Sequence, residues 1–112
     1  MKKLPACPVE TTLRLISDQW TLLIIRELKD GTKRFGELKK NLHPITQKVL
    51  TQNLKQMEIR GLVIREAFPE VPPRVEYTLT DLGFKFQPIV DLMLEYGEQY
   101  QQQYAHLIQD ND

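Results

Sequence analysis

Cysteine and histidine are scarce in this sequence, which limits the kinds of site it can hold. Cys7 is the only cysteine among 112 residues, so a framework of internal disulfides is excluded. The two histidines, His43 and His106, have no cysteine nearby and lack the ligand spacing of a zinc site. We expect neither a metal nor another cofactor.

Long apolar runs are also missing. The longest, residues 22–25, is far shorter than the roughly 20 residues that span a bilayer. The first 14 residues contain two lysines but no apolar stretch typical of a secretory signal. We therefore expect a cytoplasmic protein that does not enter a membrane.

The sequence has no arrangement of side chains typical of an enzyme. No Ser-His-Asp or Cys-His pattern and no catalytic pair of carboxylates is evident. His43 falls in a predicted turn and His106 in the tail, where simpler roles account for them. A binding protein is the expected class.

Acidic residues are few where basic ones gather, although fifteen of each cancel over the whole chain. Residues 33–60 hold seven Lys or Arg against two Glu, a local net charge of +5. Residues 91–112 hold five acids and no Lys or Arg. This separation indicates a middle region that meets a polyanion and a tail that does not. Random clustering on a neutral surface is the alternative that charge alone leaves open.

Helical signals occupy the first part of the chain. Pro8 suits the first turn of a helix, where a backbone N–H needs no partner. Ser17 or Asp18 can cap a second helix, which Gly31 ends. A third helix is predicted for residues 35–42, before a proline that disfavours helical angles in the residue preceding it.

The fourth predicted helix begins within the stretch ITQKVLTQNLK, residues 45–55. Thr46 is a good N-cap, Ile45 is placed to pack on Leu50 as a hydrophobic staple, and Gly61 suits a left-handed C-cap. Two short helices joined by a tight turn form a helix-turn-helix.

The polar face of the stretch 45–55 lacks carboxylates, although a solvated face usually mixes Glu with Lys. Glutamine can pair with adenine, lysine can donate to guanine, and the threonine methyl can pack on thymine. We expect four residues near the start of the helix to read bases: Gln47, Lys48, Thr51 and Gln52. The expected phosphate contacts are Arg34, Lys39, Lys40, Thr46 and Lys55.

A β-hairpin follows the helix-turn-helix. Residues 62–68 and 74–79 alternate in polarity as strands do, with Val75, Tyr77 and Leu79 on one side of the second strand. Three prolines in the loop, including Pro73, stiffen its tip, so the hairpin is predicted to be a wing. Arg74 is placed to enter a minor groove, or alternatively to pair with an acid such as Glu76.

The C-terminal segment, which Thr80 is predicted to cap, reads as a long helix with a bend at Gly97. Its apolar residues recur at spacings of three and four: Ile89, Met93, Tyr96, Tyr100, Tyr104 and Leu107. A seam of this length favours cover by a second copy of the chain. The alternative is that it folds back on the first helix.

Five stretches of the sequence resemble, in order and spacing, the HxlR-type transcriptional regulators, a bacterial and archaeal branch of the MarR-like winged-helix proteins. The stretches are CPVETTLRLISDQWTLLIIREL, RFGELKK, ITQKVLTQNLKQME, GLV and FPEVPPRVEYTLTDLG. The resemblance implies a dimeric DNA-binding regulator, in several members responsive to oxidants or electrophiles. The chain departs from the family in having Asp18-Gln19-Trp20 where Gly-Lys-Trp is common, and in having no second cysteine.

Cys7 precedes the predicted first helix, where the positive end of the helix can make a thiol reactive. The resemblance implies that a cysteine here is sometimes the sensor, while burial as a small hydrophobe is the structural alternative. A further possibility is an effector pocket lined by Trp20, Phe86, Tyr96 and Tyr100, although core packing explains these residues equally well.

These features predict one domain, residues 1–112, of the α+β class with mainly α structure. It is a winged helix-turn-helix with a two-stranded wing and a long C-terminal dimerisation helix. The DNA-binding core spans residues 18–80, and the dimerisation elements span residues 5–16 and 81–110. The expected function is repression by a homodimer bound to a palindromic operator in double-stranded DNA. Control by an oxidant, through Cys7, or by a small-molecule effector is a further expectation. The alternative is a winged-helix module that binds protein.

Overall fold

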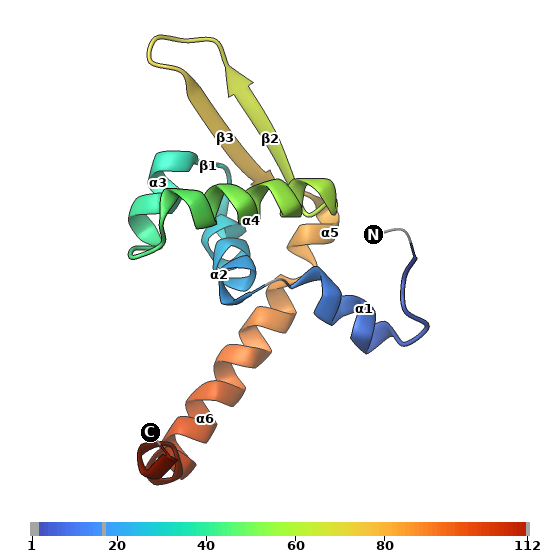
Figure 1. Cartoon of the computed structure of the whole chain (residues 1–112), viewed down its shortest axis with the longest axis vertical. Coiled ribbons are helices and arrows are strands. Elements are labelled where there is room, and N and C mark those ends of the chain that lie inside the picture. Colours follow the sequence, from blue (N-terminus) through green and yellow to red (C-terminus); the bar gives the residue numbers. More distant parts are fainter. Residues whose placement is uncertain (1–2, 17, 112) are drawn as a thin grey trace.

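The computed structural model describes residues 3–16 and 18–111, with side chains described as far as Leu107. Helices dominate, and two strands project as a hairpin (Figure 1). The elements in chain order are α1 (Pro8–Leu15), α2 (Gln19–Glu27), the 3-10 turn η1 (Leu28–Asp30), β1 (Lys33–Arg34), α3 (Phe35–Asn41), α4 (Gln47–Ile59), β2 (Val63–Phe68), β3 (Arg74–Leu79), α5 (Asp81–Phe84) and α6 (Gln87–Asn111).

The predicted caps define the helix-turn-helix. The Asp18 carboxylate accepts a hydrogen bond from the Trp20 backbone N–H at 2.9 Å and so caps α2. Ser17, the other candidate, lies outside the described residues. The Thr46 hydroxyl accepts from the Val49 N–H at 3.2 Å, and Gly61 adopts a left-handed φ of 77° just beyond α4. Both ends of α4 are therefore set by the residues predicted to set them.

The core lies between α2, α3, α4 and the base of the hairpin. α4 contributes Leu50, Leu54 and Met57, each at most 1% exposed. Ile45 is also buried in this cluster, as expected for a residue that fixes the entry of the chain into α4. α3 and α4 are thus held as a rigid pair by apolar packing on α2.

The sheet has three strands rather than only the two of the wing. β2 and β3 form the expected antiparallel hairpin, and β1 pairs with the outer side of β3 through Lys33 opposite Tyr77 and Arg34 opposite Glu76. β1 therefore anchors the wing to the start of α3. Figure 1 shows the hairpin extending well beyond this anchored base.

A tight joint connects α4, the wing and the C-terminal helices. The Thr80 hydroxyl donates to the Gly61 carbonyl at 2.6 Å and accepts from the Gly83 N–H at 3.0 Å, which confirms Thr80 as the cap of α5. A Cβ on Gly83 would collide with the Leu62 carbonyl oxygen. Only glycine permits this close approach of α5 to the base of the wing.

The last helix differs from its prediction in two respects. It is divided into α5 and α6, with the break at residues 85–86. Its non-helical residue is Tyr104, with φ −128° and ψ 21°, and the helix continues through Gly97. The bend predicted at Gly97 is therefore wrong, because a glycine permits a bend but leaves the backbone hydrogen bonds of the helix intact.

Candidate nucleic-acid interface

The outer face of α4 is polar, exposed and free of carboxylates over its first turns. The four residues predicted to read bases are all exposed: Gln47, Lys48, Thr51 and Gln52. Thr46 and Lys55 are exposed as well. Because the Thr46 oxygen accepts the capping bond, its hydroxyl proton stays available to another acceptor. The apolar stripe on the opposite side of α4 holds this face outward.

One polar residue of α4 faces inward and was not singled out from the sequence. Asn53 is 5% exposed, and its amide accepts from the Thr21 hydroxyl at 3.0 Å. Its NH₂ donates to the Val49 carbonyl at 3.0 Å and approaches the Asp18 carboxylate at 3.4 Å. Asn53 therefore ties α4 to the start of α2. Its position, three residues after Leu50, is the signal that could have revealed this burial.

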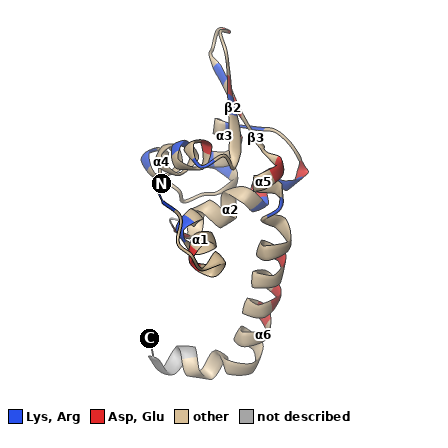
Figure 2. Ribbon diagram, turned by 90° about the vertical axis from the view of Figure 1, so that its right-hand side faces the viewer, with Lys and Arg blue, Asp and Glu red and all other residues tan. Residues whose placement is uncertain are grey.

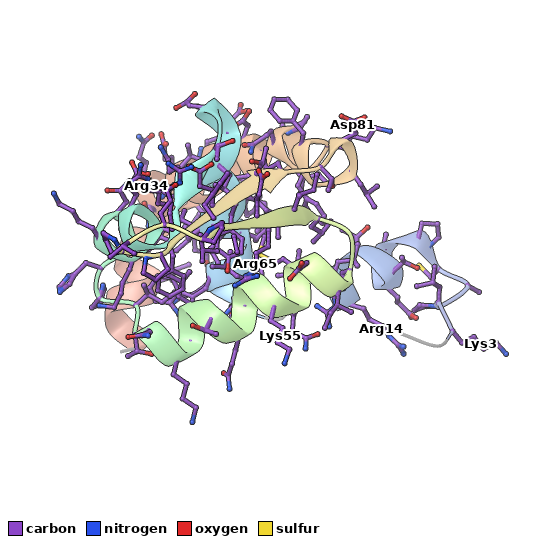
Figure 3. The ribbon with its side chains drawn as sticks, turned by 90° about the horizontal axis from the view of Figure 1, so that it is seen from above. Lys3, Arg14, Arg34, Lys55, Arg65 and Asp81 are labelled. Carbon is purple, nitrogen blue, oxygen red and sulfur yellow. The ribbon has the colours of Figure 1, made fainter. Side chains whose placement is uncertain are left out.

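A hollow of about 740 Å³ separates the start of α4 from the wing. Five of the predicted site residues line it: Arg34, Gln47, Thr51, and Pro73 and Arg74 of the wing. Lys39 and Lys40 are exposed on the last turn of α3, and Lys48, Gln52 and Lys55 are exposed on α4 outside the hollow. In Figure 3, Lys55 extends from α4 while Arg34 lies across the molecule from it.

Arg34 is positioned by the start of α3. Its backbone N–H donates to the Glu37 carboxylate at 2.9 Å, which satisfies a donor that the helix itself leaves open. Its side chain is exposed at the rim of the hollow. The bond to Glu37 uses the backbone, so the guanidinium keeps its positive charge directed to solvent.

Arg74 is engaged within the wing. Its guanidinium lies 3.0 Å from a Glu70 oxygen and 3.3 Å from a Glu76 oxygen, and its central carbon lies 4.0 Å from the centre of the Phe68 ring. The approach to Glu76 is an ionic contact rather than an aligned hydrogen bond, because Nε has no bond of acceptable geometry. The pairing with Glu76 anticipated as the alternative is present, and Glu70 is an additional partner.

The seam of α6 is exposed. Its six predicted residues range from 39% exposed for Ile89 to 68% for Tyr96, and the rings of Tyr96, Tyr100 and Tyr104 follow one another at 6.4 and 5.3 Å. The first turn of α6 is different, because Gln87 is buried and donates to the Ile25 carbonyl at 2.6 Å. Figure 2 shows acidic positions along α6 and basic ones around α4.

The four aromatic residues considered for an effector pocket do not surround one cavity. Phe86 is buried in the core and Trp20 packs against it, whereas Tyr96 and Tyr100 are exposed on α6. Core packing is therefore the correct interpretation for the first two. A shallow depression of about 340 Å³ lies on the seam itself, lined by Ile89, Leu92, Met93 and Tyr96.

Cys7 is exposed, so its interpretation as a small buried hydrophobe is wrong. It occupies the N-cap position of α1, directly before Pro8. α1 has no buried residue, and its apolar side chains Val9 and Leu13 are 66% and 62% exposed. Among the residues that the structure describes, none covers this thiol at the start of α1.

Comparison with known proteins accounts for this arrangement. Residues 15–105 match the HxlR-like helix-turn-helix family. The chain belongs to that family. Its members among the relatives are transcriptional regulators rather than enzymes. The exposed face of α4 is thus part of the DNA-binding helix-turn-helix of an HxlR-like regulator.

Individual relatives agree in sequence and shape. An HTH-type transcriptional regulator of Methanothermobacter thermautotrophicus is 45% identical over 94 residues, covering 84% of this chain and 72% of the relative. A MarR-family regulator of Porphyromonas gingivalis superposes with a TM-score of 0.80 at 40% identity, covering 88% and 96% of the two chains. The redox regulator HypR in its oxidized form gives 0.75 at 44% identity, covering 83% and 96%. The mainly helical winged-helix architecture of this HxlR-like chain is therefore shared with solved regulators.

None of the helices in residues 3–16 and 18–111 combines the length and apolar character needed to cross a bilayer. α6 is long, but glutamines and acids interrupt its apolar seam.

Proposed function

We propose that this HxlR-like regulator is a homodimeric repressor that reads a palindromic operator through α4. The observation that carries the proposal is the exposed face of the first turns of α4, residues 47–55, which lies beside the wing and holds no carboxylate. Phosphates repel carboxylates, and amides, hydroxyls and ammonium groups match the hydrogen-bonding edges of bases in a major groove. Where the operator overlaps a promoter, the bound dimer occupies DNA that polymerase needs.

The residues divide by reach into two groups. Gln47, Lys48, Thr51 and Gln52 lie in the first turns of α4, which enter deepest in a helix-turn-helix, and they contact bases. The remaining cations and the cap hydroxyl contact phosphates and add affinity that does not depend on sequence: Arg34, Lys39, Lys40, Thr46 and Lys55.

The dimer is formed by the seam of α6, joined by the exposed apolar residues of α1. Tyr96 at 68% exposure and Val9 at 66% are unusual in a small protein unless another chain covers them. A two-fold dimer places two α4 helices on successive turns of the same face of DNA, so its operator is palindromic.

Cys7 is the proposed oxidant sensor. Its exposure supports access, and HypR, a redox regulator of similar shape, supports the type of response. Two Cys7 thiols, one from each protomer, form a disulfide, and the oxidant accepts their two electrons and two protons. A mixed disulfide with a small thiol is the second product. Cys7→Ser should abolish the effect of diamide on operator affinity and leave the reduced protein's affinity unchanged.

Selection of bound sequences from a random duplex library, with reduced protein at near-physiological salt, tests the proposal. An enriched palindrome is the expected result, and it names the operator. Weak binding that disappears as salt rises, with no enriched motif, would refute base reading by α4. A winged-helix module that binds protein would then take its place.

A further inference from the structure

The two faces of the wing differ in charge. The strand register places Arg65 opposite Tyr77 and Ala67 opposite Val75, so these four side chains share one face of the hairpin. Glu66 opposite Glu76 and Phe68 opposite Arg74 share the other. Arg65, Val75 and Tyr77 line the hollow beside α4, as do Glu70 and Arg74. Tyr77 is buried in the core, so the face that it shares with Arg65 is the one directed toward α4.

On the outer face, Arg74 is a compensating charge. Glu66 and Glu76 lie directly opposite each other on β2 and β3, and repulsion between two like charges at such positions destabilises the strand pair. The guanidinium of Arg74 contacts Glu76 and Glu70 and covers the Phe68 ring, with its side chain 26% exposed. Arg74 also lines the hollow, but the carboxylates of Glu70 and Glu76 already neutralise its charge.

Arg65 is in the opposite situation. It is exposed, and among the described residues no carboxylate lies within ion-pairing distance of it. Its cross-strand neighbour Tyr77 is only 7% exposed, so packing of Tyr77 in the core fixes the backbone of the wing next to Arg65. In Figure 3, Arg65 lies between the hairpin and α4, in agreement with its place in the lining of the hollow.

We propose that Arg65 is the cation through which the wing contacts the DNA backbone, and that Arg74 is a positioning residue that maintains the shape of the wing. The inference rests on the proposed DNA binding by α4, since Arg65 shares the hollow with Gln47 and Thr51. DNA seated on α4 brings a phosphate strand to the α4-facing side of the wing, where Arg65 is the unpaired cation of the hairpin among the residues described.

The test measures the dissociation constant for duplex DNA as salt varies. Arg65→Gln removes two phosphate contacts from a dimer, so the slope of log affinity against log salt becomes less steep by about 1.8. The loss of affinity is then about tenfold greater at 50 mM than at 200 mM salt. It should be equal for the selected duplex and a scrambled one, because phosphates carry no sequence. Arg26→Gln, at an exposed arginine of α2 outside the hollow, is the matched control and should keep the original slope.

Arg74 variants separate positioning from contact. Arg74→Lys keeps the charge but loses the planar group that lies on Phe68 between two carboxylates. If Arg74 is a positioning residue, both Arg74→Lys and Arg74→Gln should bind duplex DNA more weakly than the unaltered protein. The salt slope should stay unchanged, and hydrogen exchange in β2 and β3 should be faster. Binding rescued by lysine, together with a shallower slope for glutamine, would assign the phosphate contact to Arg74 and overturn the inference.

The two proposals fail in different ways. If the unaltered protein shows no salt-sensitive binding to any duplex, the DNA-binding proposal itself fails. If it binds and Arg65→Gln retains the original slope, only the role of Arg65 fails.

Discussion

The outer surfaces of α4 and α6 show how one helical pattern can have two outcomes. Both helices carry apolar residues at spacings of three and four. In α4 that stripe is at most 1% exposed at Leu50, Leu54 and Met57, and the polar side faces outward. In α6 the stripe itself faces outward, with Met93 51% exposed. Periodicity therefore specifies a face, but what covers the face depends on the rest of the fold.

The difference also separates two kinds of partner. A polar surface without carboxylates can meet a polyanion at no cost in buried apolar area, whereas an exposed apolar seam is stabilised only by another apolar surface. The acidic positions of α6, which Figure 2 shows along the helix, are unsuited to DNA. Substitutions can alter the polar face of α4, the apolar seam of α6, or the contacts that connect these two surfaces.

The largest effect is expected from charging the α6 seam. Met93→Glu places a carboxylate in the proposed dimer interface, and the chain should become monomeric in sedimentation. Without a linked second half-site, operator affinity should fall by about 100-fold or more. Gln102→Glu adds the same charge to the opposite side of α6 and should leave both properties unchanged. A Met93→Glu protein that remains dimeric would exclude the seam as the interface.

The joint between the two surfaces is the next most sensitive place. Gly83→Ala forces a methyl group against the Leu62 carbonyl oxygen, and unfolding free energy should fall by about 2 kcal/mol or more. For a chain of this length that lowers Tm by roughly 10 °C. Gly36→Ala, where no atom lies within 4 Å, should be neutral or stabilise by up to about 1 kcal/mol. Equal Tm values for the two variants would contradict the tight packing at Gly83.

Substitutions on the α4 face should change specificity more than stability. Gln47→Ala or Gln52→Ala removes a bidentate donor and acceptor pair, which costs about 1–3 kcal/mol of discrimination at one base position. The measurement is a comparison of Kd values over single-base variants of the selected operator. A uniform loss over every sequence would place these amides on the phosphate backbone instead.

The smallest effect is expected for Lys55. At 200 mM salt, Lys55→Gln should weaken binding by less than tenfold on every duplex, and it should reduce the salt slope by about 0.9 for each protomer. Lys29→Gln, at an exposed lysine of the η1 turn, should have no effect. A loss of affinity for Lys55→Gln that depends on the base sequence would place Lys55 among the residues that contact bases.

Much of the helix-turn-helix could be predicted because its determinants are local. Thr46 and Gly61 set the ends of α4 through bonds and backbone angles within a few residues. The alternation of β3 likewise predicted which side chains share a face of the wing. Features that depend on distant partners were missed. β1 becomes a strand only because Tyr77 lies beside it, and Asn53 is buried because Thr21 and Asp18 meet it.

The candidate site divides in the same way. The exposed residues of α4 follow from its period, but the state of each charged side chain on the wing does not. Arg74 finds Glu70 through the geometry of the proline-rich tip, which leaves Arg65 as the unpaired cation among the described hairpin residues. Cys7 is exposed because α1 packs with no buried residue, which its amphipathic sequence does not indicate.

The joint at Thr80 and Gly83 has a consequence for the DNA as well. In a dimer built on α6, packed contacts from Gly61 through Thr80 to Gln87 set the separation of the two α4 helices, with no flexible linker between them. One extra base pair between half-sites moves them about 3.4 Å apart and rotates them by roughly 35°. A protein built this way selects its operator by the number of base pairs between the half-sites as well as by the base sequence.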